Sequence, residues 1–171
     1  IIVNYNVRAF LQNTLASLAR AMEGIDGEVI VVDNASDDGS VEMLKQKFPS
    51  VTIIENKKNA GFAAANNQAM RIARGEFFLL LNPDTLVEDD TLVKAVRFMD
   101  DHPDAGGLGV KMLDGKGKFL PESKRALPSP SVAFFKFFGF SRIFPRSRIF
   151  GKYHLGYLDK DGYLLVADRK K

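Results

Sequence analysis

The sequence contains no cysteine and only two histidines, His102 and His154. The absence of cysteine excludes disulfides, zinc sites made of thiolates and a cysteine nucleophile, and it agrees with a reducing compartment such as the cytoplasm. Two histidines are too few for a multi-histidine metal site. His102 precedes Pro103, where a helix is expected to end, and His154 lies in a tyrosine-rich stretch, so we predict structural roles for both.

Long hydrophobic runs and glycine-rich nucleotide loops are also missing. No apolar segment reaches the roughly 18–20 residues of a membrane span, and no signal peptide is visible. No Gly-x-Gly-x-x-Gly follows the first expected strand, and Gly-x-x-x-x-Gly-Lys-Ser/Thr is absent. A dinucleotide dehydrogenase and a P-loop enzyme therefore both lose support. The chain opens on Ile1-Ile2-Val3, which is typical of a strand already under way, so we expect a few residues upstream.

Charge is distributed unevenly along the 171 residues, of which 46% are hydrophobic and thus sufficient for a core. The net charge of +3 combines an acidic body with a basic segment. Residues 1–115 hold 11 basic and 17 acidic side chains, whereas residues 116–152 hold nine basic side chains and one acidic, Glu122. This pattern argues against a general nucleic-acid-binding surface. It favours one localised basic patch that faces anions. We therefore divide the chain into a core, residues 1–115, and a basic, aromatic-rich segment, residues 116–171.

Expected strands and helices alternate along the first 115 residues. Apolar runs predict the strands. Apolar residues at helical spacing predict the first and last helices, Ser40 as a cap predicts the second, and an alanine-rich segment of high helix propensity predicts the third. The expected strands are 1–5, 28–33, 51–55, 76–81 and 106–112, and the expected helices are 7–23, 40–47, 62–74 and 90–99. Such alternation is typical of an α/β fold with a mostly parallel sheet flanked by helices.

The strand expected at residues 76–81 stops at Asn82-Pro83-Asp84. Its five consecutive apolar residues are typical of a strand buried on both faces. Pro83 cannot donate a ladder hydrogen bond, so the strand ends there and delivers Asp84 to the carboxyl edge of the sheet, where open α/β folds bind ligands. A simple turn is the ordinary alternative interpretation of these three residues.

Polar residues follow two earlier strands as well, at Asn4-Tyr5-Asn6 and at Asp33-Asn34. Carboxylates gathered at one sheet edge suit a ligand that is cationic, metal-bound or rich in hydroxyls. Mg²⁺ or Mn²⁺ needs only one or two carboxylates when phosphate and water complete its coordination, so Asp84 is the predicted metal ligand. Asp33 is a candidate partner for a base or ribose, and residues 59–61 are candidates for donating backbone N–H groups to a phosphate.

Three spaced motifs make a family resemblance specific: residues 31–40 (VVDNASDDGS), 59–67 (NAGFAAANN) and 79–85 (LLLNPDT). Together they resemble family 2 glycosyltransferases of the GT-A fold, and within them the bacterial rhamnosyltransferase-like branch. The resemblance covers about residues 1–115. It implies inverting transfer of a sugar, with rhamnose a candidate, from a dTDP- or UDP-sugar to a glycan or lipid-linked acceptor in cell-surface polysaccharide synthesis.

The resemblance also implies roles for particular residues. The nucleotide-sugar-binding set is Asn4, Tyr5, Asp33, Asn59, Gly61, Asn66 and Asn82, with Asp84 as the ligand of Mg²⁺ or Mn²⁺. Tyr5 and Asp33 would contact the base and ribose. Asn82-Pro83-Asp84 occupies the place of the family's Asp-x-Asp metal motif.

The sequence departs from the family pattern in three ways. Asn82 replaces the first acidic residue of the metal motif, and Asn66 stands where many relatives carry an arginine. The carboxylate general base of the family is not found. The downstream acidic residues are poor substitutes because they lie in a polar tail: Asp159, Asp161 and Asp168. We therefore expect a chain truncated at its C-terminus that holds the donor-binding half of an enzyme, with a non-catalytic nucleotide-sugar-binding module as the alternative.

A nucleotidyltransferase is a third, lower-ranked interpretation. Such enzymes share this type of sheet but open with a glycine-rich, basic loop after the first strand. Residues 4–8 contain no such loop.

Phenylalanine is concentrated in the basic segment, where residues 134–150 hold seven of the chain's 14. Aromatic residues interleaved with arginines favour a peripheral contact with the inner face of an anionic membrane. The alternative is an acceptor-side helix that packs its phenylalanines against the rest of the protein. Nucleic acid is a distant third partner because the body is acidic.

Overall fold

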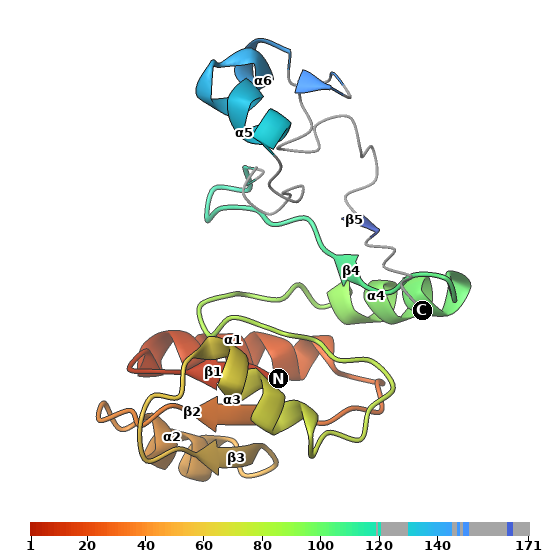
Figure 1. The fold of residues 1–171 in the computed structure, drawn as a ribbon. Helices are drawn as coiled ribbons and strands as arrows, with labels where there is room; N and C mark the ends of the chain where they lie inside the picture. The colour runs from red at the N-terminus through yellow and green to blue at the C-terminus, as the bar shows by residue number, and fades with distance from the viewer. Residues whose placement is uncertain (119, 121–129, 145–146, 148, 151–163, 166–171) are drawn as a thin grey trace. The chain divides into compact units, whose positions relative to one another are not determined.

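The computed structural model describes residues 1–118, 120, 130–144, 147, 149–150 and 164–165 (Figure 1). The chain divides into two compact units, Ile1–Val96 and Arg97–Lys171. The predicted division at residue 115 was drawn on charge and resemblance rather than compactness, and it stays a prediction. Three acidic residues weighed as general bases, Asp159, Asp161 and Asp168, lie outside the described residues, as does His154.

The first unit is built on a three-stranded parallel sheet. Its strands, β1 (Ile2–Asn4), β2 (Ile30–Asp33) and β3 (Thr52–Glu55), lie in the order β1-β2-β3. The register pairs Asn4 with Asp33 and Asp33 with Glu55. All three strands therefore end level with one another, and we call this side of the sheet the carboxyl edge.

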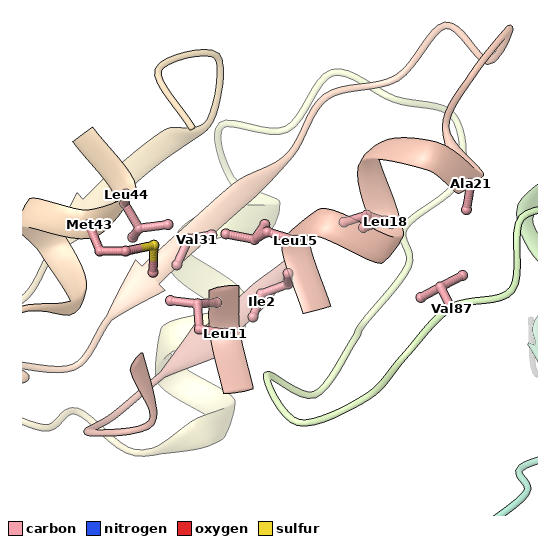
Figure 2. Close-up of a cluster of buried hydrophobic side chains, with 9 residues drawn as sticks. All are labelled: Ile2, Leu11, Leu15, Leu18, Ala21, Val31, Met43, Leu44 and Val87. Atoms are coloured by element: carbon pink, nitrogen blue, oxygen red, sulfur yellow. The ribbon is translucent and has the colours of Figure 1, made fainter. Parts of the chain in front are cut away.

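Helices cover both faces of this sheet. They are α1 (Arg8–Ala21), α2 (Ser40–Lys47) and α3 (Phe62–Met70). Successive strand residues point to opposite faces, so Ile2 and Val31 pack against α1 and α2, whereas Val3 and Val32 pack against α3. Figure 2 shows the larger of the two resulting clusters, which contains Ile2, Leu11, Leu15, Leu18, Ala21, Val31, Met43, Leu44 and Val87. The predicted α/β fold with a parallel sheet flanked by helices is confirmed.

The prediction of a regular, doubly buried strand at residues 76–81 is wrong. The segment forms one isolated parallel bridge, Ile2 to Leu81, and Phe77 to Leu80 are 40–50% exposed. Two hydrogen bonds join it to the start of β1: the Ile1 amino group donates to the Leu79 carbonyl and the Leu81 N–H donates to the Ile1 carbonyl. Because β1 is only three residues long, it supplies too few ladder partners to hold a full strand in register.

The helix predicted to run from residue 62 to Arg74 ends four residues early. Its last residue is Met70, and the Arg74 N–H donates instead to Glu28 Oε1 at 2.6 Å. The same Glu28 lies before β2, which begins at Ile30 rather than residue 28. The Glu28 side chain, which is distant in the sequence, thus binds the backbone N–H at the predicted end of the helix. Local helix propensity does not reveal such a contact.

A fourth helix, α4 (Thr91–Asp101), spans the boundary between the two units and has no fully buried residue. In the second unit, β4 (Leu108–Gly109) pairs antiparallel with β5 (Leu164–Leu165). The prediction of a longer strand at residues 106–112 within the parallel sheet is therefore wrong. Its actual partner lies more than fifty residues further along the chain, where a local pattern cannot identify it.

Two helices complete the described part of the second unit: α5 (Pro130–Phe137) and α6 (Phe140–Ile143). Gly139, with a φ of 77°, joins them in the left-handed conformation that glycine adopts readily. Among the described helices, none is both long and apolar enough to cross a bilayer.

Candidate functional site

Asp33 is the centre of the carboxyl edge. It is the last residue of β2 and only 2% exposed. Its Oδ1 accepts a hydrogen bond from Asn4 Nδ2 at 2.8 Å, and its Oδ2 accepts one from the Ser36 N–H at 2.8 Å. The structure thus brings together two predicted site residues, Asn4 and Asp33, and holds the carboxylate in one orientation.

Asn4 links β1 to the turn after β2. Its Nδ2 donates to Ser36 Oγ at 3.0 Å as well as to Asp33. Its Oδ1 is buried and has no hydrogen-bond partner within the described parts of the chain. Buried polar atoms normally find a partner, so this oxygen is able to accept a hydrogen bond from a water or a ligand.

The loops after β1 and β2 are joined to each other. The Asn6 N–H donates to Ser36 Oγ at 3.0 Å, and the Asp37 N–H donates to Asn6 Oδ1 at 2.9 Å. Asn6 and Ala35 both have positive φ, 54° and 64°, an unusual conformation for residues other than glycine. Tyr5 lies between the hydrogen-bonded residues Asn4 and Asn6 and is 50% exposed. Its ring is therefore accessible for stacking on a planar ligand.

Asp38 connects the N-termini of two helices. Its carboxylate accepts hydrogen bonds from the N–H of Arg8, which begins α1, and from the N–H of Ser40, which begins α2. The Ser40 hydroxyl donates to the same carboxylate. Desolvation opposes the charge of Asp38, but the Ser40 hydroxyl and these backbone N–H groups outweigh it and hold the pKa of Asp38 below its usual value.

Three predicted site residues lie in the loop before α3 and in α3 itself. Asn59 Oδ1 accepts a hydrogen bond from the Gly61 N–H at 2.9 Å, and both residues are exposed. Gly61 has a φ of 81°, so a side chain there would strain the backbone even though the space is open. Asn66 is different: it is 5% exposed and donates to the Phe62 carbonyl within its own helix.

Asn82-Pro83-Asp84 follows the bridge at Leu81. The Pro83 carbonyl accepts a hydrogen bond from Thr14 Oγ1 at 2.7 Å, which ties the segment to α1. Asn82 and Asp84 are exposed. The bridge runs parallel to β1, so the three residues follow it in the direction in which β1 ends. No hydrogen bond joins Asp84 to Asp33 in the described structure.

Asp84 is an exposed carboxylate, and the side chains around it determine which kind of metal ion it could bind. No group of three or more histidine, cysteine or acidic side chains able to hold a metal ion occurs among the described residues. One exposed carboxylate, with the Asn82 amide nearby in the chain, does not form a cage made only of protein ligands. It suits Mg²⁺ or Mn²⁺ that takes its remaining oxygens from phosphate and water.

Several residues that hold this edge together were missed by sequence reasoning. Ser36 bonds directly to the predicted site residues Asn4 and Asp33, and Thr14 bonds to Pro83, which lies between Asn82 and Asp84. Asn6 bonds to the loop after β2, at Ser36 and Asp37. Ser36 had a usable signal, because an aspartate commonly accepts the N–H of a residue two or three positions later in a turn. Thr14 had none, because its partner lies 69 residues away.

Fold and site together define a class of protein. A parallel sheet flanked by helices presents a polar carboxyl edge with fixed carboxylates, an accessible ring and a helix N-terminus, and this edge is where open α/β folds bind their ligands. The chain belongs to glycosyl transferase family 2, whose model matches residues 1–158. The predicted family is thereby confirmed, whereas its rhamnosyltransferase-like branch stays a prediction.

Curated relatives are similar over part of their length. The chain is 31% identical over 134 residues to poly(ribitol-phosphate) beta-glucosyltransferase of Bacillus spizizenii, covering 75% of this chain and 21% of that protein. It is 27% identical over 136 residues to poly(ribitol-phosphate) beta-N-acetylglucosaminyltransferase TarS of Staphylococcus aureus, covering 77% and 24%. The chain thus spans about a quarter or less of these two relatives.

Solved structures share the GT-A fold. Mannosyltransferase PcManGT from Pyrobaculum calidifontis, in complex with GDP-Man and Mn²⁺, superposes with a TM-score of 0.59 and 30% identity over 67% of this chain and 35% of that one. S. aureus TarS 1–349 in complex with UDP gives a TM-score of 0.56 at 24% identity, covering 77% and 38%. The second likeness, at this identity, concerns the fold alone.

Proposed function

We propose that this chain is the donor-binding part of an inverting glycosyltransferase that transfers a sugar from a nucleotide diphosphate to a cell-surface polymer. The observation that carries the proposal is the Asn4–Asp33–Ser36 network at the carboxyl edge, found in a chain of glycosyl transferase family 2. The names of the relatives support poly(ribitol-phosphate) or a similar polymer as the acceptor class. A lipid-linked glycan is the other acceptor to be tested.

The predicted site residues fall into three groups in this proposal. Asp33, oriented by Asn4, and the exposed ring of Tyr5 recognise the base and ribose. Asn59, Gly61 and the N-terminus of α3 approach the diphosphate, because the first N–H groups of a helix have no partner within the helix. The remaining assigned residues are Asn66 in α3, and Asn82 and Asp84 beside β1, with Asp84 as the metal ligand.

A divalent cation bound at Asp84 would neutralise the diphosphate of the donor and of the departing nucleotide. The chain's own part is to hold that carboxylate in place: Thr14 fixes the Pro83 carbonyl, and the following turn is closed by the Thr85 N–H and the Asn82 carbonyl at 3.3 Å. No residue of the chain is assigned as the general base that takes the proton of the acceptor hydroxyl.

Isothermal titration calorimetry with UDP, dTDP and GDP, each with and without Mn²⁺, tests the donor class. We expect binding of UDP or dTDP that strengthens with Mn²⁺. Preference for dTDP would support the predicted rhamnosyl donor, whereas preference for UDP would support a UDP-hexose. Absence of binding for all three nucleotides would contradict the proposal.

Asp84→Ala tests the metal role. We expect the Mn²⁺-dependent part of UDP affinity to be lost and the metal-independent part to remain. Asp26→Ala is the matched control, because Asp26 is an exposed carboxylate that precedes β2 and thus lies at the opposite end of that strand. Unchanged metal dependence in Asp84→Ala would remove Asp84 from the site. Turnover of a UDP-sugar with poly(ribitol-phosphate) as acceptor would show that the chain is an active transferase and would exclude a non-catalytic binding module.

We also propose a peripheral contact of residues 134–150 with an anionic membrane surface, on the cytoplasmic side where a lipid-linked acceptor would be presented. Phe137 is 85% exposed, and Phe134 and Phe138 are more than half exposed. Co-sedimentation with phosphatidylglycerol vesicles should fall in Phe137→Ser but not in the control Phe10→Ser, whose ring on α1 is also exposed. Equal sedimentation of all three proteins would contradict the contact. Arg146 and Arg148 lie outside the described residues.

A further inference from the structure

Three side-chain amides form a connected network beside the proposed diphosphate site. Asn56 Nδ2 donates to Asn34 Oδ1 at 2.9 Å and to Gln68 Oε1 at 2.9 Å, and Gln68 Nε2 donates back to Asn56 Oδ1 at 3.0 Å. Asn34 follows β2, Asn56 follows β3 and Gln68 lies in α3. The amide network, as we call these three residues, therefore joins three elements of the first unit.

A backbone N–H sets the direction of the whole network. The Ala60 N–H donates to Asn34 Oδ1 at 3.4 Å, so the oxygen of Asn34 must face the loop before α3. That oxygen then requires the Nδ2 group of Asn56, which leaves Asn56 Oδ1 to accept from Gln68. Each amide has one arrangement that satisfies its neighbours, and a change at Gln68 would reach Ala60 through two side chains.

The network encloses a short exposed loop. Asn56 begins it, Ala60 is held near its end, and between them Lys57, Lys58 and Asn59 are exposed. The Asn56 N–H also donates to the Asp33 carbonyl at 2.9 Å, which anchors the start of the loop to the carboxyl edge. Both ends of the loop are thus fixed while its two cations face solvent.

We infer that Asn34, Asn56 and Gln68 are positioning residues for the donor diphosphate. In this proposal the three side chains do not contact the donor themselves. They hold the loop 57–61 so that the N-terminus of α3 and the cations of Lys57 and Lys58 meet the phosphates in one arrangement, which reduces the ordering cost of binding. The inference rests on the proposed function, and it adds Asn34, Asn56 and Gln68 to the residues on which donor binding depends.

Gln68→Met tests the network because methionine has a similar length and cannot form either hydrogen bond. We expect the affinity for UDP, measured by calorimetry with Mn²⁺, to fall about five- to tenfold, as for the loss of one or two hydrogen bonds. The affinity for uridine, which lacks phosphate, should change less than twofold by ligand-observed NMR titration. Gln12→Met is the matched control, because Gln12 in α1 accepts a hydrogen bond from Lys47 on the surface.

A second variant shows whether the three amides act as a unit. Asn56→Ala removes the centre of the network, and adding Gln68→Met to it should cause no further loss of UDP affinity. If Gln68→Met unfolds, Asn56→Ala gives the same comparison of UDP with uridine. Additive losses in the double variant would overturn the network, as would equal losses for UDP and uridine.

Amide hydrogen exchange supplies a readout that needs no ligand. The Ala60 N–H should exchange faster in Gln68→Met, while the N–H of Leu11 in α1 keeps its protection. Unchanged exchange at Ala60 would overturn the inference even if UDP binds. Failure of the unsubstituted chain to bind any nucleotide would contradict the proposed function, and the inference with it, whereas faster exchange at Ala60 would still show that the network holds the loop.

Discussion

The two compact units use apolar residues in opposite ways. Of the fully buried hydrophobic side chains among the described residues, all but Val132 lie in Ile1–Val96. The second unit is rich in phenylalanine, yet Phe137, Phe138 and Ile143 are more than half exposed. Apolar composition therefore does not decide burial. The first unit offers a sheet with helices on two faces, and the described part of the second offers only short elements.

The second unit does pack some of its aromatic rings together. Phe135 lies 4.9 Å from Phe150 between ring centroids, in an edge-to-face arrangement, and Phe140 stacks near Phe150 at 5.6 Å. These rings form a small aromatic cluster across α5, α6 and the residues that follow. Phe134 lies 5.8 Å from Phe135 and 4.5 Å from Phe138, so it links Phe138 to this cluster. Phe137 contacts Phe138, and both rings are more than half exposed.

Leu11→Ala is expected to cause the largest change in the comparison of the two units. Leu11 is fully buried between α1 and the sheet, so the variant should lower the free energy of unfolding by about 3 kcal/mol through lost burial and a cavity. Phe137→Ala, in the second unit, should change it by less than about 0.5 kcal/mol. Urea unfolding followed by circular dichroism measures both. Similar losses would mean that Phe137 is covered in the native protein.

Asp38→Ala should have the second-largest effect, about 1–2 kcal/mol at pH 7, because two helix N-termini lose their shared acceptor. The folded pKa of Asp38 is below its usual value. Its contribution is therefore present above the unfolded pKa of about 4 and is lost as the pH falls through the folded pKa. The difference between the two proteins should shrink in urea titrations below about pH 4.

Asp114→Ala is the matched comparison in the second unit. Its carboxylate also accepts two backbone hydrogen bonds, from Lys116 and Lys118, but within an exposed turn. We expect a loss smaller than about 1 kcal/mol. A larger loss than that of Asp38→Ala would contradict the view that the first unit carries most of the stability.

Thr14→Val separates packing from positioning within the first unit. The buried Thr14 hydroxyl donates to the Pro83 carbonyl, so its removal should cost about 1 kcal/mol of stability and weaken Mn²⁺-dependent UDP binding a few-fold. Thr52→Val, at an exposed position of β3, should change neither quantity. Calorimetry and thermal unfolding report the two effects. If UDP binding by Thr14→Val keeps its normal dependence on Mn²⁺, the hydrogen bond from α1 to Pro83 does not contribute to the metal site.

Surface ion pairs should give the smallest effects and should not distinguish the units. Arg20 lies 3.3 Å from Asp89 and Arg97 lies 3.9 Å from Asp101, and all four side chains are largely exposed. Arg20→Ala and Arg97→Ala should each change the free energy of unfolding by less than about 0.5 kcal/mol, and less still in 0.5 M salt. A loss above 1 kcal/mol for either variant would contradict the view that exposed ion pairs contribute little to stability.

Local patterns were sufficient for the first three strands and the helices between them. Hydrophobic periodicity located α1, Ser40 as a helix start located α2, and the apolar runs before Asn4 and Asp33 located β1 and β2. The contact between Asn4 and Asp33 followed from parallel pairing, because strands that run in one direction end at one edge. The polar edge was therefore readable from residue order.

The same reasoning failed where a contact joins distant parts of the chain. Residues 77–80 are as apolar as a buried strand, but burial requires neighbours on both sides, and the partner strand β1 is short. The amide network is invisible in the sequence, because Asn34, Asn56 and Gln68 are ordinary polar residues until folding brings their three elements together.

The sequence by itself determined the alternation of strands and helices, the place of the carboxylates at strand ends and the family. The first two follow from periodicity and spacing, which are properties of neighbouring residues, and the family follows from the resemblance carried by three motifs. Only the tertiary structure decided which polar side chains hold one another, how Asp38 joins two helices and which phenylalanines are exposed. Such features depend on distances between atoms far apart along the chain, and those distances are set when the whole chain packs.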